Sequence, residues 1–346
     1  TAATLTITAM RTRMTAAMTT DSGTRPTSAS GGLASCSLCP RACGVNRAAG
    51  ARGVCGADDT LVVARAALHR WEEPPISGTH GSGTVFFSHC PLHCVYCQNE
   101  VIAAGEAGVE ISIDRLAEIF GELRDKGALN LNMVTPTHYA VQIRAAIDKA
   151  RQAGVDLPVV WNTSGYETVS AIRANAGYVD VYLADFKYLS GDLAARYSKA
   201  PDYPSVAFSA LEEMVEQVGE PRFDEYEGDE RMTSGVIVRH LMLPGALEDS
   251  KRIVRTVWER FGASVTLSLM NQYTPVLADA AASGNTAASR ELARCPELAE
   301  RVSNEQYEEL LDFADSLGID QYFWQEGGAA EESFIPAFDL EGVLHS

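Results

Sequence analysis

The chain has 346 residues, which is long enough for one large α/β domain with a smaller appendage, and its 46% hydrophobic content is typical of a globular protein with a sizeable core. The formal net charge of −18 argues against nucleic acid and against an anionic membrane surface as the main partner, because both require a basic footprint. No apolar stretch is long enough to span a bilayer.

The first thirty residues are rich in Thr, Ala and Met and nearly free of acidic residues. Such a composition is typical of a disordered leader, of a transit peptide, or of residues that precede a later start at Met10, Met14 or Met18. We therefore place residues 1–32 outside the fold.

Seven of the eight cysteines lie between Cys36 and Cys97, whereas Cys295 stands apart and is interpreted as a free thiol without a role. Such clustering in a large α/β chain predicts metal binding in a reducing, cytoplasmic compartment and not a disulfide framework.

Residues 33–80 are predicted to form a small cysteine-rich module and its linker. The module contributes four thiols, from Cys36, Cys39, Cys43 and Cys55. Four thiolates can close around zinc or an iron–sulfur cluster, or they can remain free thiols, and the spacing leaves these alternatives open. Because a set of four leaves no open coordination position, the predicted role is structural or that of an electron relay. The linker, residues 71–78, carries two glutamates, Glu72 and Glu73, that are interpreted as solvated charges.

From residue 84 onward the sequence alternates between strand and helix patterns. Strands are predicted at 84–89, 131–134, 157–161, 179–184, 235–242 and 264–269, and helices at 112–127, 141–153, 167–175, 192–199, 205–218, 247–261 and 304–317. Six βα units predict a partial (β/α)6 TIM-like barrel over residues 81–320, followed by a C-terminal tail, 321–346. A doubly wound sheet is the alternative fold. The acidic stretch 212–230 is interpreted as solvated helix and loop.

Directly after the first predicted strand, Cys90, Cys94 and Cys97 have C-x3-C-x2-C spacing. Three thiolates can hold three corners of a [4Fe–4S] cluster, which leaves the fourth iron free to bind a ligand that is not protein. The alternatives are a structural zinc site completed by His89 or His93, and a disulfide, which would leave one of the three cysteines unpaired.

Polar side chains follow the other predicted strands. They are Thr135 and His138 after the second strand, Asn162 and Thr163 after the third, Asp185 and Lys187 after the fourth, and Arg239 within the fifth. The carboxyl ends of barrel strands meet at one rim, so these groups predict a site that orients an amino-acid moiety, a ribose and an adenine. Structural roles are the alternatives: Asp185 and Lys187 would pair with neighbours, a buried Arg239 would need a carboxylate, and His138 would cap the next helix.

Taken together, these motifs resemble those of the radical S-adenosylmethionine (SAM) proteins related to pyruvate formate-lyase-activating enzyme, in the subgroup with an additional N-terminal cysteine module. The resemblance covers about residues 33–320 and rests on CSLCPRACG at 36–44, GSGTVFF at 81–87, CQN at 97–99, TPTH at 135–138, NTSGY at 162–166, DFKY at 185–188 and RHLMLPG at 239–245.

The resemblance implies a [4Fe–4S] cluster on Cys90, Cys94 and Cys97. Its open iron would bind SAM, and reductive cleavage of SAM would yield a 5′-deoxyadenosyl radical that abstracts hydrogen. The implied cofactor contacts are Tyr96 near the adenine, Thr135 at the amino group, Asn162, Thr163 and Asp185 along the ribose and methionine, and Arg239 at the carboxylate, with His138 and Lys187 at the rim. The second strand lacks the Gly-Gly-Glu common in the family, and Asn162 stands where activating enzymes usually carry aspartate.

The implied partners are an electron donor such as flavodoxin or ferredoxin, and either a glycyl radical enzyme or a small-molecule substrate as hydrogen donor. The resemblance leaves the catalytic side chains and the substrate of this oxidoreductase class unassigned. The alternative to an enzyme is a non-catalytic iron–sulfur or zinc protein that serves electron transfer or structure.

Overall fold

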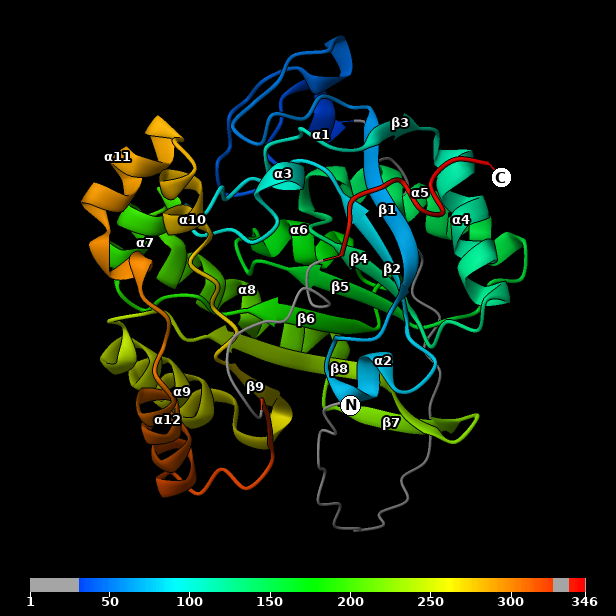
Figure 1. Ribbon diagram of the computed structural model, residues 1–346. Coiled ribbons are helices and arrows are strands. Elements are labelled where there is room, and N and C mark those ends of the chain that lie inside the picture. The colour runs from blue at the N-terminus through cyan, green and yellow to red at the C-terminus, as the bar shows by residue number, and fades with distance from the viewer. Residues whose placement is uncertain (1–30, 326–335, 346) are drawn as a thin grey trace.

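The structure is a computed structural model that describes residues 31–325 and 336–345 (Figure 1). Residues 1–30 of the predicted leader therefore lie outside the described residues. Within the described part of the chain, no helix is long and apolar enough to cross a membrane.

One mixed sheet of ten strands forms the centre of the molecule (Figure 1). Its order is β10-β9-β8-β6-β5-β4-β2-β1-β3, and β7 pairs with β8 outside this path. The strands are β1 Leu61–His69, β2 Ser82–Phe87, β3 Val109–Ile111, β4 Leu131–Val134, β5 Val159–Thr163, β6 Val181–Asp185, β7 Arg222–Tyr226, β8 Asp229–Leu241, β9 Thr266–Met270 and β10 Tyr322–Trp324.

The strands from β2 to β9 run parallel and follow one another in chain order across the sheet, apart from the hairpin strand β7 and the edge strand β3. In a doubly wound sheet the order would reverse at a switch point. The single direction of winding therefore argues against the doubly wound alternative and is the strand order that a partial barrel requires. All six predicted parallel strands are confirmed, with boundaries shifted by a few residues.

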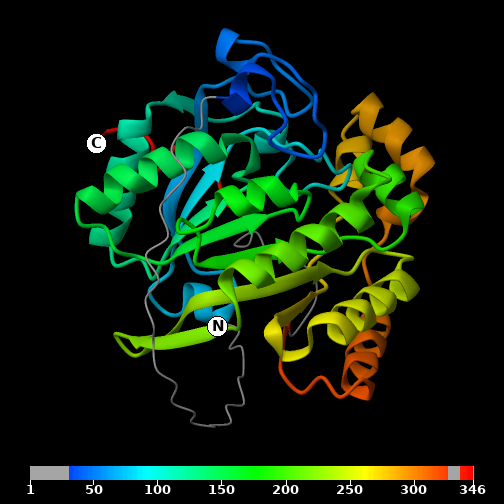
Figure 2. The same ribbon diagram turned by 180° about the vertical axis from the view of Figure 1, so that it is seen from behind.

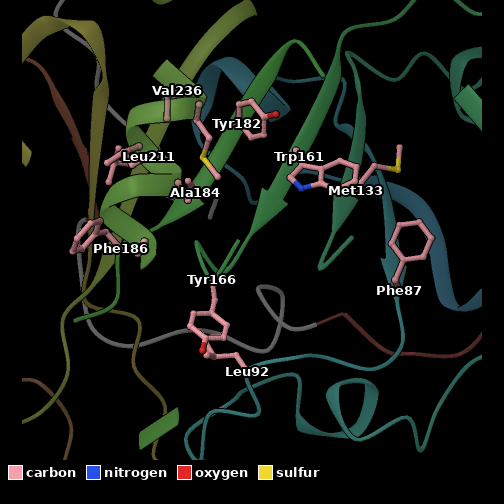
Figure 3. Close-up of a cluster of buried hydrophobic side chains, with 14 of the residues drawn as sticks. Phe87, Leu92, Met133, Trp161, Tyr166, Tyr182, Ala184, Phe186, Leu211 and Val236 are labelled. Carbon is pink, nitrogen blue, oxygen red and sulfur yellow. The ribbon is translucent and has the colours of Figure 1, made fainter. Parts of the chain in front are cut away.

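The described residues form twelve α-helices. They are α1 Gly31–Ala34, α2 Pro74–Ser77, α3 Glu100–Ala103, α4 Ile113–Asp125, α5 Ala140–Gln152, α6 Val169–Ala174, α7 Gly191–Ser198, α8 Tyr203–Val218, α9 Leu247–Phe261, α10 Val276–Ala282, α11 Thr286–Arg294 and α12 Asn304–Ser316. The reverse view in Figure 2 shows α4, α5, α6 and α8 in front of the strands. The main core lies between this layer and the sheet; Figure 3 shows Met133, Trp161, Tyr182 and Val236 projecting from four neighbouring strands into it.

Local sequence signals account for the helix boundaries. The side chain of Ser112 accepts a hydrogen bond from Arg115 N and so caps α4, which is worth about 1 kcal/mol. The predicted apolar face of this helix is buried. The predicted bounds of α9, 247–261, agree with the structure.

The opposite face of the sheet is closed in part by α2, a single helical turn next to β8 (Figure 1). Ile76 is fully buried there and packs with Val160, Val181, Leu183 and Ile237. The interpretation of residues 71–78 as a solvated linker is therefore wrong. Pro74 occupies the first turn of α2, where a missing N–H costs nothing, and the turn places Ile76 against the strands.

The structure also places strands in residues 61–69, predicted as part of the cysteine-rich module and its linker, and in residues 212–230, predicted as solvated helix and loop. Residues 61–69 form β1, which pairs antiparallel with β2 and belongs to the main sheet. This strand contains three alanines, which are depleted in strands, and its apolar residues do not alternate with polar ones, so its sequence carries only a weak strand signal. The acidic stretch contains the end of α8 and β7, which forms a hairpin with β8.

Residues 336–345 lie along β1. Leu340 N donates to Ala64 O over 3.1 Å, and Ala66 N donates to Glu341 O over 2.8 Å. The guanidinium of Arg65 pairs with both Asp339 and Glu341. This segment is thus bound to β1, the neighbour of β2, which leads into the Cys90 loop.

Candidate functional site

Two residues separate the end of β2 from Cys90, the first cysteine of the loop that also contains Cys94 and Cys97. Leu92 N donates to Cys90 Sγ over 3.4 Å, and Cys97 N donates to Cys94 O over 3.1 Å, which closes a tight turn. All three thiols are free and partly buried. N–H groups directed at sulfur are the donors that a cluster-bound thiolate accepts, so the loop fits an iron–sulfur cluster.

The three thiols lie close enough to influence one another. Burial, and to a smaller extent the neighbouring Cys94 thiol, raises the pKa of Cys90 to about 11. Burial, followed by Cys94 and Cys90, also raises the pKa of Cys97. Thiolates gathered in this way need a compensating positive charge, which a metal centre supplies.

These thiols and a loop histidine do not form a binding site for a single metal ion. Within residues 31–325 and 336–345, no three His, Cys, Asp or Glu side chains are grouped closely enough to hold one metal ion. His93 Nε2 instead lies 3.0 Å from Val54 O, and the His89 ring packs against Gly105. A cluster differs from a single ion because each thiolate binds its own iron, so its ligands stand farther apart.

Three hydroxyl groups lead to the sulfur of Cys94. Ser198 Oγ donates to Cys94 Sγ over 3.0 Å. The hydroxyl of Tyr188 lies 2.8 Å from Ser198 Oγ and 2.7 Å from the hydroxyl of Tyr96. Tyr96 is buried edge-on against Tyr188 and Tyr197. The side chain predicted to lie near an adenine is thus part of a buried tyrosine cluster behind the loop.

Four of the predicted rim residues meet on the inner face of the sheet, the face that carries α2. Arg239 Nε donates to Asp185 Oδ1 over 2.9 Å and Arg239 Nη2 donates to Asn162 Oδ1 over 2.6 Å, while Lys187 Nζ donates to Asp185 Oδ2 over 2.6 Å. Burial opposes the charge of Asp185, but Arg239 and Lys187 outweigh it and lower the pKa of this carboxyl. Lys187 also interacts with Cys94, which connects this group to the cysteine loop.

Glu72 joins the same group, although its sequence context predicts a solvated side chain. Its Oε2 accepts from Arg239 Nη1 over 3.2 Å, and its Oε1 accepts from Asn132 over 3.1 Å and from Asn162 over 3.2 Å. Burial raises the pKa of Glu72 and of its neighbour Glu73, against the influence of Arg239. The buried anchor in α2 holds both carboxylates inside, so their interpretation as solvated charges is wrong.

An arginine inside an apolar strand indicates that a carboxylate is buried nearby, and Arg239 is such an arginine. The sequence offers no means of choosing Glu72 among the many acidic residues. Two acceptors in this region, Glu73 Oε2 and Asn132 Oδ1, have no hydrogen-bond partner among the described residues.

The other predicted contacts belong to the surrounding structure. Thr163 Oγ1 donates to the buried Glu167 over 2.7 Å, and His138 Nε2 lies 2.8 Å from Ser88 O. Burial lowers the pKa of His138 to about 3, so its ring is neutral. Thr135 has a left-handed backbone, with φ 57°, and its N–H donates to Asn162 O over 2.9 Å. These residues surround the site without joining the Arg239 group.

The four thiols of the N-terminal module influence one another electrostatically, although within the described residues no three of them are grouped closely enough to hold one metal ion. Burial raises the pKa of Cys39 to about 12, with smaller increases from Cys55 and Cys36. Burial also raises the pKa of Cys55, to which Cys36 and Cys43 add. The backbone of Gly53 passes so close that a Cβ there would lie 2.3 Å from Cys43 Sγ, which explains the glycine at this position.

Comparison with known families finds a similarity in part of the chain. Residues 76–194 match the family model described as a 4Fe-4S single cluster domain, a range that contains Cys90, Cys94 and Cys97 and excludes the N-terminal thiols. An uncharacterized protein of Methanocaldococcus jannaschii is 25% identical over 296 residues, which cover 82% of this chain and 75% of the relative.

Among solved structures, SuiB of Streptococcus suis bound to the precursor peptide SuiA aligns with a TM-score of 0.45 and 15% identity, over 69% of this chain and 46% of SuiB. SuiB bound to S-adenosylmethionine aligns with a TM-score of 0.41 and 15% identity, over 69% of this chain and 45% of SuiB. The chain spans about half the length of SuiB. A similarity at this level does not define a common fold, so it assigns no activity to this chain.

Proposed function

We propose that the protein is a radical SAM enzyme with a partial (β/α)6 barrel, in which Cys90, Cys94 and Cys97 hold a [4Fe–4S] cluster that keeps one iron open. The observation that carries the proposal is the loop of three free, partly buried thiols directly after the first parallel strand. When bound, the cluster supplies the low-potential electron that cleaves SAM to methionine and a 5′-deoxyadenosyl radical.

The residues at the strand ends would hold and orient SAM. In this proposal Asn162 and Asp185 line its ribose and methionine side, Tyr96 lies near the adenine, and Arg239 meets the carboxylate as a charge-assisted pair. Arg239 already donates to Asp185, Asn162 and Glu72. A SAM carboxylate at Arg239 would therefore share it with these groups or displace Glu72.

The remaining predicted contacts have supporting roles in the proposal. Thr135 would border the amino group, and Thr163, His138 and Lys187 would fix the walls around it. The hydrogen donor is proposed to be a glycine of a partner enzyme or a small molecule, and the electron donor a flavodoxin or ferredoxin. The thiols of the N-terminal module are proposed to hold a second iron–sulfur cluster or zinc.

Anaerobic reconstitution with iron and sulfide, followed by SAM and a strong reductant, tests the proposal. The native chain should form 5′-deoxyadenosine, and a Cys94→Ser variant should lose both the activity and the iron of this cluster. Cys295→Ser is the matched control, because Cys295 is a buried thiol outside both cysteine sets. A native protein whose cluster is fully reduced but neither binds nor cleaves SAM would contradict the proposal.

A non-catalytic iron–sulfur or zinc protein is the second candidate, and the two neighbouring cysteine sets favour it. Electron paramagnetic resonance separates the candidates, because SAM bound at an open iron changes the spectrum of the reduced cluster. An unchanged spectrum together with reversible electron transfer would favour the second candidate, and zinc alone would favour a structural role.

A further inference from the structure

One side chain of the N-terminal module reaches the cysteine loop of the barrel. Arg41 lies between Cys39 and Cys43. Its Nε donates to Pro91 O over 2.9 Å, and its Nη2 donates to Leu92 O over 3.5 Å. Both acceptors are backbone carbonyls between Cys90 and Cys94, so the loop is held from the module side.

The same guanidinium also holds the end of α7. Arg41 Nη2 donates to Ser198 O over 2.9 Å and Arg41 Nη1 donates to Lys199 O over 2.6 Å. The guanidinium carbon lies 5.2 Å from the centre of the Tyr166 ring, which fixes its plane. Arg41 therefore joins three segments: the module, the cysteine loop and the end of α7.

The end of α7 matters because Ser198 carries a hydroxyl that donates to Cys94 Sγ over 3.0 Å. Hydrogen bonds to the sulfur ligands of an iron–sulfur cluster stabilise its reduced, more negative state and so raise its reduction potential. The backbone carbonyl of Ser198 is one of the four that Arg41 holds. A path of two hydrogen bonds thus leads from the module to the sulfur of Cys94.

The junction is also under backbone strain. Ala42, His93 and Lys199 all have left-handed backbones, with φ of 40°, 51° and 50°. Such conformations are costly for residues other than glycine and persist where surrounding contacts enforce them. Ala42 follows Arg41 itself, His93 follows the acceptor Leu92, and Lys199 is one of the acceptors. The contacts of Arg41 are therefore well placed to maintain this geometry.

We infer that Arg41 is a positioning residue through which the N-terminal module sets the reduction potential of the cluster at Cys90, Cys94 and Cys97. The inference rests on the proposed function, because it requires a cluster in that loop. It assigns the module a role that does not depend on whether its own thiols hold zinc or iron.

The planar guanidinium is essential to this role. Arg41 reaches four carbonyls with a fork of five N–H donors, whereas a lysine carries three donors on a single nitrogen and cannot reach both segments at once. We therefore expect Arg41→Lys to behave like Arg41→Ala in its effect on the cluster, although it keeps the charge.

The test compares Arg41→Lys, Arg41→Ala and Ser198→Ala in the full chain. The midpoint potential is measured by a redox titration followed by paramagnetic resonance. Arg52→Ala is the matched control, because Arg52 belongs to the same module, is exposed, and within the described residues donates its side-chain hydrogen bonds to Asp58. All three test variants should shift the potential to a more negative value, and the control should retain the native potential.

A double variant, Arg41→Ala with Ser198→Ala, tests whether the two residues act along one path. If they do, its potential should be no more negative than that of the stronger single variant. Hydrogen exchange of the iron-free protein gives a second readout: Arg41→Lys should speed exchange in residues 89–97 and 190–199 and leave the exchange of α4 unchanged. Because Arg41→Lys keeps the charge and the side-chain stem, it decides the question if Arg41→Ala does not fold.

Two results separate the inference from the proposed function. A native protein that holds no iron at Cys90, Cys94 and Cys97 would overturn both. A native protein with this cluster, and Arg41 variants that retain its native potential and exchange while Ser198→Ala shifts the potential, would overturn the inference alone.

Discussion

Glu72 Oε2 lies 3.2 Å from Arg239 Nη1 on the inner face of the sheet. The other oxygen of Glu72 accepts from Asn132 and Asn162. The carboxylate therefore ties β4, β5 and β8 to the segment that precedes β2. Because the same arginine is held by Asp185, the segment and the proposed SAM-binding residues form one continuous polar group.

We expect Glu72→Ala to lower the free energy of unfolding by about 3 kcal/mol, because it removes one partner of a buried ion pair and leaves two amides without an acceptor. Glu72→Gln keeps an oxygen that Asn132 and Asn162 can use and should cost less. Urea unfolding at pH 7 measures both effects. Glu248→Ala is the control, because Glu248 is 84% exposed in its pair with Lys251 and should change stability by less than about 0.5 kcal/mol. Equal losses for Glu72→Ala and the control would contradict the prediction.

The sequence predicts the parts of the fold that rest on local patterns. The six parallel strands and the helices α4 and α9 follow from hydrophobic periodicity and capping, and the three-cysteine loop follows from its position after the first of these strands. Asp185, Lys187 and Arg239 come together because they occupy neighbouring strand ends.

The sequence does not predict contacts that arise from long-range packing. A pair of glutamates before two prolines has the composition of an exposed turn, and only the docking of Ile76 on the sheet brings Glu72 to Arg239. The hydrogen bond that Thr163 Oγ1 donates to Glu167 is likewise absent from the sequence patterns, because no pattern marks Glu167 as buried.

Glu167 should make stability depend on pH. Burial raises the pKa of this carboxyl, although Thr137, Thr163 and Trp161 all donate to it. A raised folded pKa means that the folded state binds the proton more tightly than the unfolded state. Its contribution is therefore fully present below the unfolded pKa, about 4.3, and is lost as the pH rises from there through the folded value, by at most about 1.4 kcal/mol per pH unit.

Glu167→Gln tests this dependence. All three donors bond to Oε1, so a glutamine can keep them with its amide nitrogen in the place of Oε2. We expect this variant to lose less stability between pH 4.5 and pH 7 than the native chain, as measured by urea unfolding at several pH values. Parallel curves for the two proteins would show that Glu167 does not titrate in this window.

His138 should make stability depend on pH in the opposite direction. Burial lowers its pKa to about 3, and its Nε2–H donates to Ser88 O, two residues before Cys90. The unfolded chain binds a proton at this histidine below about pH 6.5, whereas the folded chain does not. Stability from this group is therefore present above pH 6.5 and is lost as the pH falls toward 3, by up to about 1.4 kcal/mol per pH unit.

His138→Gln removes the titrating ring and retains an N–H donor of similar reach. We expect the variant to be less stable than the native chain at pH 7, because the buried ring packs against Tyr139, and to lose less stability between pH 6.5 and pH 4. Thermal unfolding at several pH values and matched ionic strength measures how the stability of each protein changes with pH. A variant as sensitive to acid as the native chain would assign the acid sensitivity to other groups.

Gly165 should be intolerant of any side chain, for a reason that involves the proposed site. Its backbone has φ 76°, and a Cβ there would lie 2.2 Å from Asp185 O, at the end of β6. Alanine would have to adopt a left-handed conformation and also push away the backbone of the residue that holds Arg239 and Lys187. We expect Gly165→Ala to lower the free energy of unfolding by about 2 kcal/mol or more, and to weaken SAM binding in protein that still folds.

The control is Gly121→Ala: Gly121 lies inside α4, and a Cβ there would meet nothing within 4 Å. Alanine should stabilise this helix by about 0.5–1 kcal/mol, so opposite signs in the two variants, measured by urea unfolding, would trace the effect of Gly165 to its contact with Asp185 and not to a general effect of replacing glycine.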